Sequence, residues 1–543
     1  MSRERLYLFD TTLRDGQQTA GVDFSAEDKT RIALALDGLG LDYVEGGWPG
    51  ANPTDADFFA NPPKLTRATF TAFGMTKRAG RSAANDDTLA GVVNAGTPAV
   101  CLVGKTHDFH VTTALGVSLE ENLAAIADSI AHLAALGREP LFDAEHFFDG
   151  WKANRDYALA CVQAAYDAGA RWVVLCDTNG GTLPDEIRKI VADVLRFIPG
   201  DRLGIHCHDD CGTAVAGSLA AVDAGVRQIQ GTLNGLGERC GNANLVTLLP
   251  TLLLKEPYRS AYEISVDEAH LPKLTKVSRM LDDILNRTPN RHAPYVGSAA
   301  FTHKAGLHAS AILKDPRTYE HIPPEVVGNE RVVPMSNQAG LSNLRGRLAE
   351  MGLEIDAKDP RLPRILDEVK LREEQGFAYD GAQASFELLA RAKLGALPRF
   401  FDVERYRVIV ERRRNAKGEK ITVSEAVVVA RIDGERLLSV SESHDPHSEA
   451  DQGPVNALSR ALAKDLGRYQ SYIDDMKLVD FKVRITSGGT EAMTRVTIDH
   501  SDAEGRRWTT VGVSANIVDA SFQALLDGVI WKLIRDGAAA AAP

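Results

Sequence analysis

Residues 203–210 read LGIHCHDD, an apolar run of strand length that ends in a cluster of His, Cys and Asp. The length and apolar character predict a buried strand, and the polar cluster starts where that strand would end. Seven other runs have the same form. They are LYLFD (6–10), DYVEGG (42–47), TFTAFG (69–74), AVCLVG (99–104), LFDAEHF (141–147), WVVLCD (172–177) and RQIQGTL (227–233).

Segments with helical periodicity follow these runs, for example AEDKTRIALALDGLG (26–40) and NLAAIADSIAHLAALG (122–137). A strand and a helix repeated eight times predict an α/β fold, a TIM (β/α)8 barrel, over residues 1–270. A doubly wound sheet of the Rossmann type is the alternative, but no GxGxxG pattern follows the first run. We therefore expect an active site at the carboxyl ends of the barrel strands.

Size and charge limit the class of protein. A chain of 543 residues is too long for a single hydrophobic core. Its formal net charge of −12 argues against nonspecific binding to nucleic acid or to an anionic membrane. The sequence contains no apolar run of about 18 residues and no apolar stretch typical of a signal peptide, so we expect a cytoplasmic protein. The six cysteines are few for this length and are expected to be reduced thiols.

The part of the chain after the predicted barrel divides into two regions. Residues 271–400 read as a mostly helical connecting subdomain, and residues 401–543 read as an α+β domain. Within this last domain, the strand-like run 424–443 and the helix-like run 454–467 are echoed about 70 residues later. Two strand-strand-helix halves therefore indicate an internal duplication, with Ser514 as the expected N-cap of the final helix. Because no catalytic cluster is evident there, we interpret this domain as a ligand-sensing or dimerisation domain.

The strongest chemical signal is HCHDD at the end of the seventh strand. Side chains alternate along a strand, so His206 and His208 point to one face and Cys207 to the other. Two imidazoles on one face are a common way to hold a divalent metal. A zinc knuckle of Cys207 and Cys211 is an alternative, but it needs ligands from opposite faces. Ordinary polar loop histidines are the third interpretation.

Two other regions lie close to this cluster if the barrel closes, because closure places the first and eighth strands side by side. They are DTTLRDG (10–16) and LNGLGERCGNANL (233–245). Spacing alone does not choose between Asp10 and Asp15, and ordinary turn chemistry explains DG and GN equally well. Spacing also does not decide which amide side chain is a ligand, and the candidates are Asn234, Asn242 and Asn244.

Three separated motifs resemble a known family. FDTTLRDGQQ (9–18), HCHDDCGTAVA (206–216) and GERCGNANL (237–245) are similar to the family of 2-isopropylmalate, homocitrate and citramalate synthases. The resemblance implies that a divalent metal ion, Mg, Mn or Zn, is held by four side chains, which are Asp15, His206, His208 and Asn242. One departure is Asp209, where family members often have Asn, and we expect it to tune the site without loss of metal.

The resemblance also implies roles for residues at the mouth of the barrel. Arg14 would contact the keto oxygen of a 2-oxo acid and stabilise the alkoxide formed on attack. Thr178 would bind the substrate carboxylate, although a helix N-cap explains it equally well. Glu145 would be an active-site glutamate that orients Arg14 or the catalytic base.

The resemblance also implies residues that act on the second substrate, an acetyl thioester. Removing a proton from its methyl group requires a positioned base. The resemblance assigns this role to His308 with Tyr319, which would act across a homodimer interface. Gly235 and Gly237 would let the backbone approach the thioester or CoA, although tight turns also explain them.

Four stretches most resemble the citramalate synthases within that family. These are 44–59, 103–111, 144–154 and 377–389. The implied substrates are pyruvate and acetyl-CoA, which would give citramalate and CoA in isoleucine biosynthesis. The last domain resembles the family's regulatory domain, which implies an end-product amino acid, isoleucine, as effector. A 2-isopropylmalate synthase using 2-oxoisovalerate, a related acyl-CoA lyase and a catalytically inactive amino-acid sensor are the alternatives.

Overall fold

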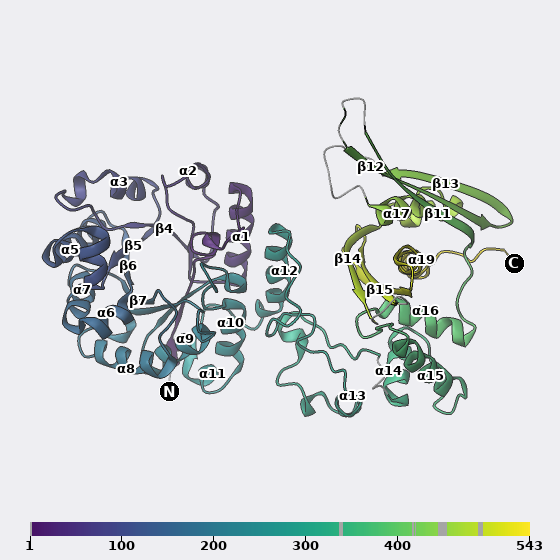
Figure 1. The fold of residues 1–543 in the computed structure, drawn as a ribbon. Helices are drawn as coiled ribbons and strands as arrows, with labels where there is room; N and C mark the ends of the chain where they lie inside the picture. Colours follow the sequence, from purple (N-terminus) through teal and green to yellow (C-terminus); the bar gives the residue numbers. More distant parts are fainter. Residues whose placement is uncertain are drawn as a thin grey trace. The chain divides into compact units, whose positions relative to one another are not determined.

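The computed structural model describes residues 3–335, 340–414, 418, 420–443, 453–486 and 492–542. It divides into two compact units (Figure 1). The first, called here the barrel unit, comprises Met1–Phe301 and Ile322–Arg331, and the second, the C-terminal unit, comprises Thr302–His321 and Val332–Pro543. Residues 271–400, expected to form one connecting subdomain, are thus shared between the two units.

Eight parallel strands close into a barrel in sequence order, which confirms the predicted fold and excludes the doubly wound sheet. Closure is made by the first and last strands of the ring, where Tyr7 lies opposite Gln228 and Asp10 lies opposite Gly231. The strands are β2 (Tyr7–Asp10), β3 (Tyr43–Glu45), β4 (Thr69–Met75), β5 (Ala99–Lys105), β6 (Glu139–Glu145), β7 (Trp172–Asp177), β8 (Leu203–Cys207) and β9 (Gln228–Gly231).

Helices surround the barrel. The first of them begins with a capping box, in which Ser25 accepts from the backbone N–H of Asp28 and the Asp28 carboxylate accepts from that of Ser25. The main helices of the unit are α1 (Ala26–Leu39), α2 (Pro53–Ala60), α3 (Asp87–Asn94), α5 (Leu119–Ala135), α6 (Phe147–Ala153), α7 (Arg155–Asp167), α8 (Pro184–Val194), α9 (Ala214–Ala224), α10 (Leu245–Leu254) and α12 (Leu274–Ile284). They carry the apolar side chains that pack against the outer face of the barrel.

The interior of the barrel is apolar at one end and polar at the other. A separate cluster of buried side chains, including Phe9, Leu141 and Trp172, fills the lower part of the barrel. Toward the carboxyl ends of the strands, buried polar groups replace them on the inner face, and these are Glu45, Asp143, His206 and Gln230. The polar end is where chemistry is possible.

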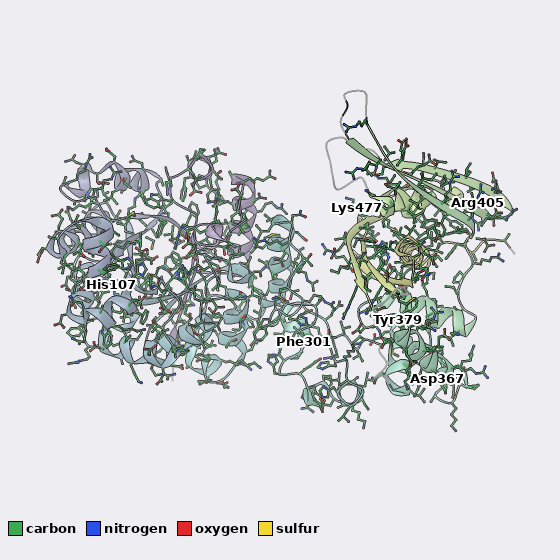
Figure 2. All side chains as sticks on the ribbon, viewed as in Figure 1. His107, Phe301, Asp367, Tyr379, Arg405 and Lys477 are labelled. Carbon is green, nitrogen blue, oxygen red and sulfur yellow. The ribbon has the colours of Figure 1, made fainter. Side chains whose placement is uncertain are left out.

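The C-terminal unit begins with helices and ends in a duplicated α+β arrangement. The helices are α13 (Gly306–Ile312), α14 (Leu341–Glu350), α15 (Arg361–Glu374) and α16 (Gln383–Leu394). Tyr379, labelled in Figure 2, is buried in the core of this helical region. One half of the duplication is β11 (Asp402–Arg414), β12 (Lys420–Ile432), β13 (Glu435–Ser443) and α17 (Pro454–Lys464); the other is β14 (Lys477–Ile485), β15 (Thr494–Ser501), β16 (Arg507–Ser514) and α19 (Ile517–Arg535).

Two details of the duplication differ from the sequence-based expectation. Each half has three antiparallel strands and not two. In the first half, a tight turn with positive φ at Asp433 and Gly434 splits the run 424–443 into a hairpin. The cap of the last helix is Asn516, whose side chain accepts from the N–H of Val518. Ser514 accepts from the N–H of Asn516 instead.

No helix among the described residues has the length and apolar character needed to span a bilayer.

A buried ion pair ties the first two barrel loops together. Lys29, fully buried on α1, forms an ion pair with Asp55 of α2. Its ammonium also donates to the carbonyl oxygens of Leu13 at 2.9 Å and Gly46 at 3.1 Å. Burial lowers the pKa of Lys29, and the Asp55 carboxylate opposes that shift. The pair therefore fixes the backbone next to Arg14.

Replacing Asp55 by Ala should destabilise the barrel unit, because it leaves the ammonium of Lys29 buried without its counter-charge. We expect the free energy of unfolding to fall by about 3–5 kcal/mol. Glu268→Ala is the control, since its partner Arg259 lies on the surface at 3.7 Å, and there the loss should stay below about 1 kcal/mol. Urea unfolding followed by circular dichroism measures both, and equal losses would contradict the role of the buried pair.

Candidate functional site

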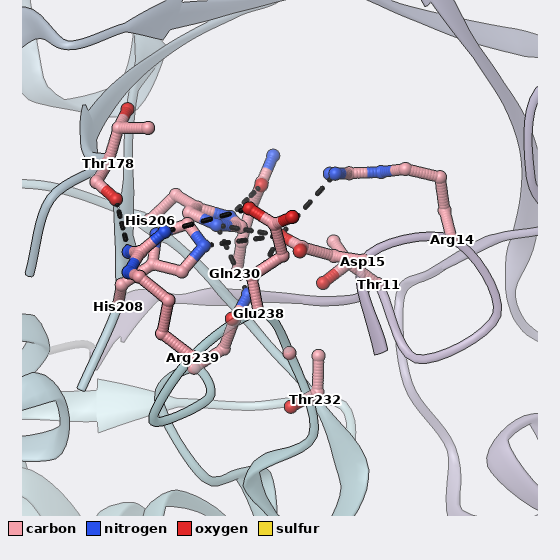
Figure 3. Close-up of polar contacts among 12 residues, drawn as sticks. Thr11, Arg14, Asp15, Thr178, His206, His208, Gln230, Thr232, Glu238 and Arg239 are labelled. Atoms are coloured by element: carbon pink, nitrogen blue, oxygen red, sulfur yellow. Dashed lines mark hydrogen bonds and ion pairs between the residues drawn. The ribbon is translucent and has the colours of Figure 1, made fainter. Parts of the chain in front are cut away.

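Polar side chains from several strands converge at the carboxyl end of the barrel. Asp15 follows β2, and His206 and His208 lie at the end of β8 (Figure 3). All three are buried, and one possible ligand atom from each lies within 4.8 Å of the others. The structure thus brings together the Asp and the two His residues that the family resemblance implied as ligands.

The distances centre on one oxygen of Asp15. Its Oδ2 lies 3.1 Å from Nε2 of His206 and 3.9 Å from Nε2 of His208. The Nδ2 of Asn242 lies 2.9 Å from the same oxygen and 3.2 Å from Nε2 of His206. Four side chains therefore present nitrogen and oxygen atoms to one small space.

The structure separates these residues from the alternatives that spacing left open. The Asp10 carboxylate accepts from the backbone N–H and the hydroxyl of Thr12, at 2.8 and 2.7 Å. Asn234 donates to the Ser278 carbonyl at 3.0 Å, and Asn244 caps α10. Asp10, Asn234 and Asn244 are therefore engaged in local structure.

The cysteine alternative is wrong. Cys207 belongs to the apolar core between barrel and helices, whereas His206 and His208 face the other side of the strand. Cys211 is exposed. The alternation of side chains along β8 explains this separation.

Glycine makes room for Asn242. Gly237 has a φ of 157°, and a Cβ at that position would lie 2.0 Å from Oδ1 of Asn242. The same loop is held against β8, because Ala243 donates its N–H to the Cys207 carbonyl at 2.9 Å. Gly237 was expected to let the backbone approach a thioester; in this structure the absence of its side chain accommodates an amide. Gly235, with a φ of 70°, lies in the turn before it.

The four side chains fit a divalent metal ion. Oδ1 of Asn242 and Nδ1 of His208 are buried and have no hydrogen-bond partner within the described part of the chain. Rotating the side-chain amide of an asparagine by 180° exchanges its oxygen and its nitrogen. For Asn242, that rotation directs Oδ1 toward Asp15 and His206. Two imidazole nitrogens, a carboxylate oxygen and an amide oxygen then form a donor set that Mg, Mn and Zn accept.

Arg14 lies beside this group, held by carboxylates that the sequence reasoning missed. Its Nε donates to Oε2 of Glu45 at 2.7 Å, and its Nη2 lies 4.0 Å from Oδ2 of Asp143. Its Nη1 is 3.4 Å from Oδ2 of Asp15, and the guanidinium lies 4.1 Å from the ring centre of Phe73. Arg14 is thus fixed on several sides.

The charges around Arg14 set the protonation of the site. Burial alone would raise the pKa of Asp15, but the Arg14 charge and the hydrogen bond from His206 hold it well below the usual range. Burial lowers the pKa of Arg14, and Glu45, Asp15 and Asp143 reverse that effect, so the pKa lies above its usual value. Arg14 and Asp15 are therefore both ionised.

The two histidines differ in their electrostatics. Burial, and then the nearby His206, lower the pKa of His208 to about 4. Burial also acts to lower the pKa of His206, but its hydrogen bond with Asp15 raises the pKa above the usual value. His208 is thus neutral at neutral pH, which a metal ligand requires.

Thr178 is not a helix cap. The nearest helix in sequence, α8, begins at Pro184, with Leu183 at its N-cap. The Thr178 Oγ1 accepts from the backbone N–H of His146 at 2.8 Å. With that acceptor position used, the hydroxyl proton points elsewhere and can reach a ligand oxygen.

Glu145 does not take the position expected for a residue that orients Arg14. Its carboxylate forms an ion pair with Lys105 of β5, and Arg14 is held instead by Glu45, Asp15 and Asp143. The next residue, His146, has a left-handed φ of 59° and stacks on His110, with ring centres 4.0 Å apart. Glu145 thus belongs to a separate charged group at the ends of β5 and β6.

His308 and Tyr319 belong to the C-terminal unit. Their rings stack, with centres 4.1 Å apart and planes inclined by 28°. Both side chains are exposed, Tyr319 to 44%. The structure brings these two candidates together although 10 residues separate them in the sequence.

The sequence analysis also missed two charged residues next to the site, Arg239 and Asp210. Arg239 adopts a φ of 54° and forms a double hydrogen bond with Asp210, at 2.7 and 2.9 Å. A charged pair inside the glycine-rich stretch 237–241 was a signal that could have indicated it. Asp209 accepts from the N–H of Ala214 at 2.8 Å, at the start of α9. An asparagine oxygen could accept that bond equally well, so the bond does not require the charge of Asp209.

Gly237→Ala should displace the Asn242 side chain, because the new Cβ would overlap Oδ1. We expect a folded protein whose affinity for Mn²⁺, measured by isothermal titration calorimetry, falls at least about tenfold. Gly212→Ala is the control: its φ of 68° is also positive, but nothing lies within 4 Å of its added Cβ. If both variants bind Mn²⁺ as the unmodified protein does, Asn242 is not needed at the site.

Three family models match the chain. The HMGL-like model matches residues 5–280, the model described as homocitrate synthase post-HMGL domain-like matches residues 295–376, and the LeuA allosteric (dimerisation) domain matches residues 380–531. Together they cover both units.

Curated proteins of several organisms are similar over nearly the whole chain. An (R)-citramalate synthase of Aquifex aeolicus is 45% identical, over 98% of this chain and 98% of its own length. That of Synechocystis is 46% identical over 97% and 96%. A probable 2-isopropylmalate synthase of Methanopyrus kandleri is 32% identical over 97% and 98%. The similarity to the citramalate synthases is therefore the greater.

Proposed function

Because this chain belongs to the HMGL-like family and, within it, to the citramalate synthases, we propose that it condenses acetyl-CoA with pyruvate to give (R)-citramalate and CoA. The observation that carries the proposal is the convergence of Asp15, His206, His208 and Asn242 beside Arg14. The sequence identity to relatives named for this reaction supports the choice of substrates.

We propose that these four ligand residues hold a divalent metal ion. When bound, the metal supplies a Lewis acid that polarises the keto group of the 2-oxo acid. The pKa of Asp15 lies below its usual range and that of His208 is about 4, so both residues are already in the protonation state that ligation needs.

Arg14 is proposed to bind the keto oxygen and stabilise the negative charge that develops on it. The guanidinium keeps N–H groups for a ligand, because only some of its five donors are used by Glu45 and Asp15. Its orientation is set before the substrate arrives, which is the condition for effective electrostatic stabilisation. Thr178 is proposed to donate its hydroxyl proton to the substrate carboxylate.

The nucleophile arises when a base removes a proton from the methyl group of acetyl-CoA. We propose His308 as that base, with Tyr319 stacked on it. The resulting carbanion forms a bond to C2 of pyruvate as the C=O π bond opens, and the keto oxygen takes up a proton to become the tertiary hydroxyl of the product. Water then cleaves the thioester, and CoA leaves as the thiol. Glu145, held by Lys105, remains a proposed orienting residue for the base.

The last domain is proposed to bind isoleucine as a feedback effector in isoleucine biosynthesis and to contribute to a homodimer. The match of residues 380–531 to the LeuA allosteric (dimerisation) domain supports both parts of this proposal. A 2-isopropylmalate synthase activity is the second candidate, because a relative with that name is 32% identical over almost the full length.

Release of CoA thiol from acetyl-CoA should be fastest with pyruvate and should stop when a chelator removes the metal. The assay uses the full chain with pyruvate, 2-oxobutanoate and 2-oxoisovalerate, each with and without EDTA. A clear preference for 2-oxoisovalerate would reject the substrate assignment and leave the metal-dependent mechanism in place. Release of CoA that continues in the presence of EDTA would reject the proposed role of the metal ion.

Two substitutions at the ligands complete this test. Asp15→Ala and His206→Ala should abolish turnover while the far-UV circular dichroism spectrum stays that of the unmodified protein. Cys211→Ala is the control, because Cys211 is an exposed thiol close in sequence to both histidines. Unchanged, metal-dependent activity in either ligand variant would overturn the assignment of that residue.

Isoleucine should lower the rate of CoA release in the same assay. The expected result is saturable inhibition by isoleucine at concentrations where leucine has little effect, because the effector proposed here is the end product of this pathway. Stronger inhibition by leucine would favour the 2-isopropylmalate synthase alternative. No effect of either amino acid would reject feedback by a branched-chain end product.

A further inference from the structure

Gln230 joins the metal-ligand group to the residues that hold Arg14. It lies on β9, is fully buried, and has a hydrogen bond at each end of its amide. Oε1 lies 2.8 Å from Nδ1 of His206, and Nε2 donates to Oδ1 of Asp143 at 3.0 Å (Figure 3 shows Gln230 beside His206). The amide thus bridges β6 and β8.

The direction of each hydrogen bond follows from the chemistry of the partners. Asp143 stands next to the guanidinium of Arg14, and a carboxylate offers acceptors only. The NH₂ end of Gln230 must therefore face Asp143, and its carbonyl oxygen must face His206. Because that oxygen can only accept, Nδ1 of His206 has to carry a proton.

A proton on Nδ1 leaves the lone pair of a neutral imidazole on Nε2. In His206 it is Nε2 that faces Asp15 and Asn242, at 3.1 and 3.2 Å. The hydrogen bond to Gln230 therefore keeps the proton on Nδ1, so that when Nε2 gives up the hydrogen it donates to Asp15, the neutral tautomer that remains is the one that can serve as a ligand at this position.

We propose that Gln230 is a positioning residue that fixes the tautomer and ring orientation of His206, and so sets the affinity of the site for a divalent metal ion. The proposal rests on the metal site proposed above. It adds that the acceptor end of this amide, and not merely its bulk, is required.

The same strand supplies a matched control. Gln228 lies two residues earlier, is also fully buried, and faces the same side of β9. Within the described residues, neither Nε2 nor Oε1 of Gln228 has a hydrogen-bond partner. Gln228→Met and Gln230→Met thus make the same chemical change in the same strand, and one of them removes the bond to His206.

Mn²⁺ binding to the metal-free full chain tests the proposal, with free Mn²⁺ followed by electron paramagnetic resonance. Gln230→Met should raise the Kd for Mn²⁺ about 10- to 100-fold, whereas Gln228→Met should leave it unchanged. The melting temperature of each metal-free variant is recorded alongside. A purely structural role would change that temperature and spare the Kd.

Reversing the polarity of the bridge gives a second test. Glu at position 230 still accepts from His206, but it places a carboxylate against Asp143. Gln230→Glu should therefore weaken Mn²⁺ binding, and adding Asp143→Asn should restore much of it, because the new amide can donate to Glu. Absence of any recovery in the double variant would count against the proposed direction of the hydrogen bonds.

The outcomes separate two kinds of failure. If the unmodified protein binds Mn²⁺ and His206→Ala abolishes binding, but Gln230→Met binds as Gln228→Met does, the role of Gln230 is rejected while the metal site stands. If His206→Ala binds Mn²⁺ like the unmodified protein, the proposed metal site itself is rejected.

Discussion

The pairing of β2 with β9 is the constraint on which the site depends. This parallel contact closes the barrel and places the loop after β2 beside the loop after β9. Asp15 therefore meets Asn242 although 227 positions separate them in the chain. Without closure the two histidines of β8 would face one side of an open sheet, with no carboxylate opposite.

A second level of organisation is electrostatic. One cation, Arg14, lies among the carboxylates of Asp15, Glu45 and Asp143 inside the barrel. Burying charges in this way requires mutual compensation, because each ion loses its hydration. The same arrangement that compensates the charges also orients the guanidinium toward the metal-ligand group, so the stability of the site and its proposed chemistry depend on the same contacts.

The sequence predicted the barrel and the shared face of His206 and His208, because both follow from periodicity. It did not distinguish Asp15 from Asp10, since that choice depends on the turn after β2, where Thr12 engages Asp10. Glu45, Asp143 and Gln230 were missed for a related reason. They lie inside short strands whose ordinary function is packing, and their contacts are with strands far away in the sequence. Polar residues inside an otherwise apolar run, as in RQIQGTL, were the available signal.

The apolar filling of the lower barrel has a kinetic consequence. Phe9, Leu141 and Trp172 close that end, so ligands reach Arg14 and Asp15 through the end formed by the carboxyl termini of the strands. Both substrates of the proposed condensation would share this one entrance. In that reaction the 2-oxo acid, which has to reach Arg14, would have to bind before the larger thioester.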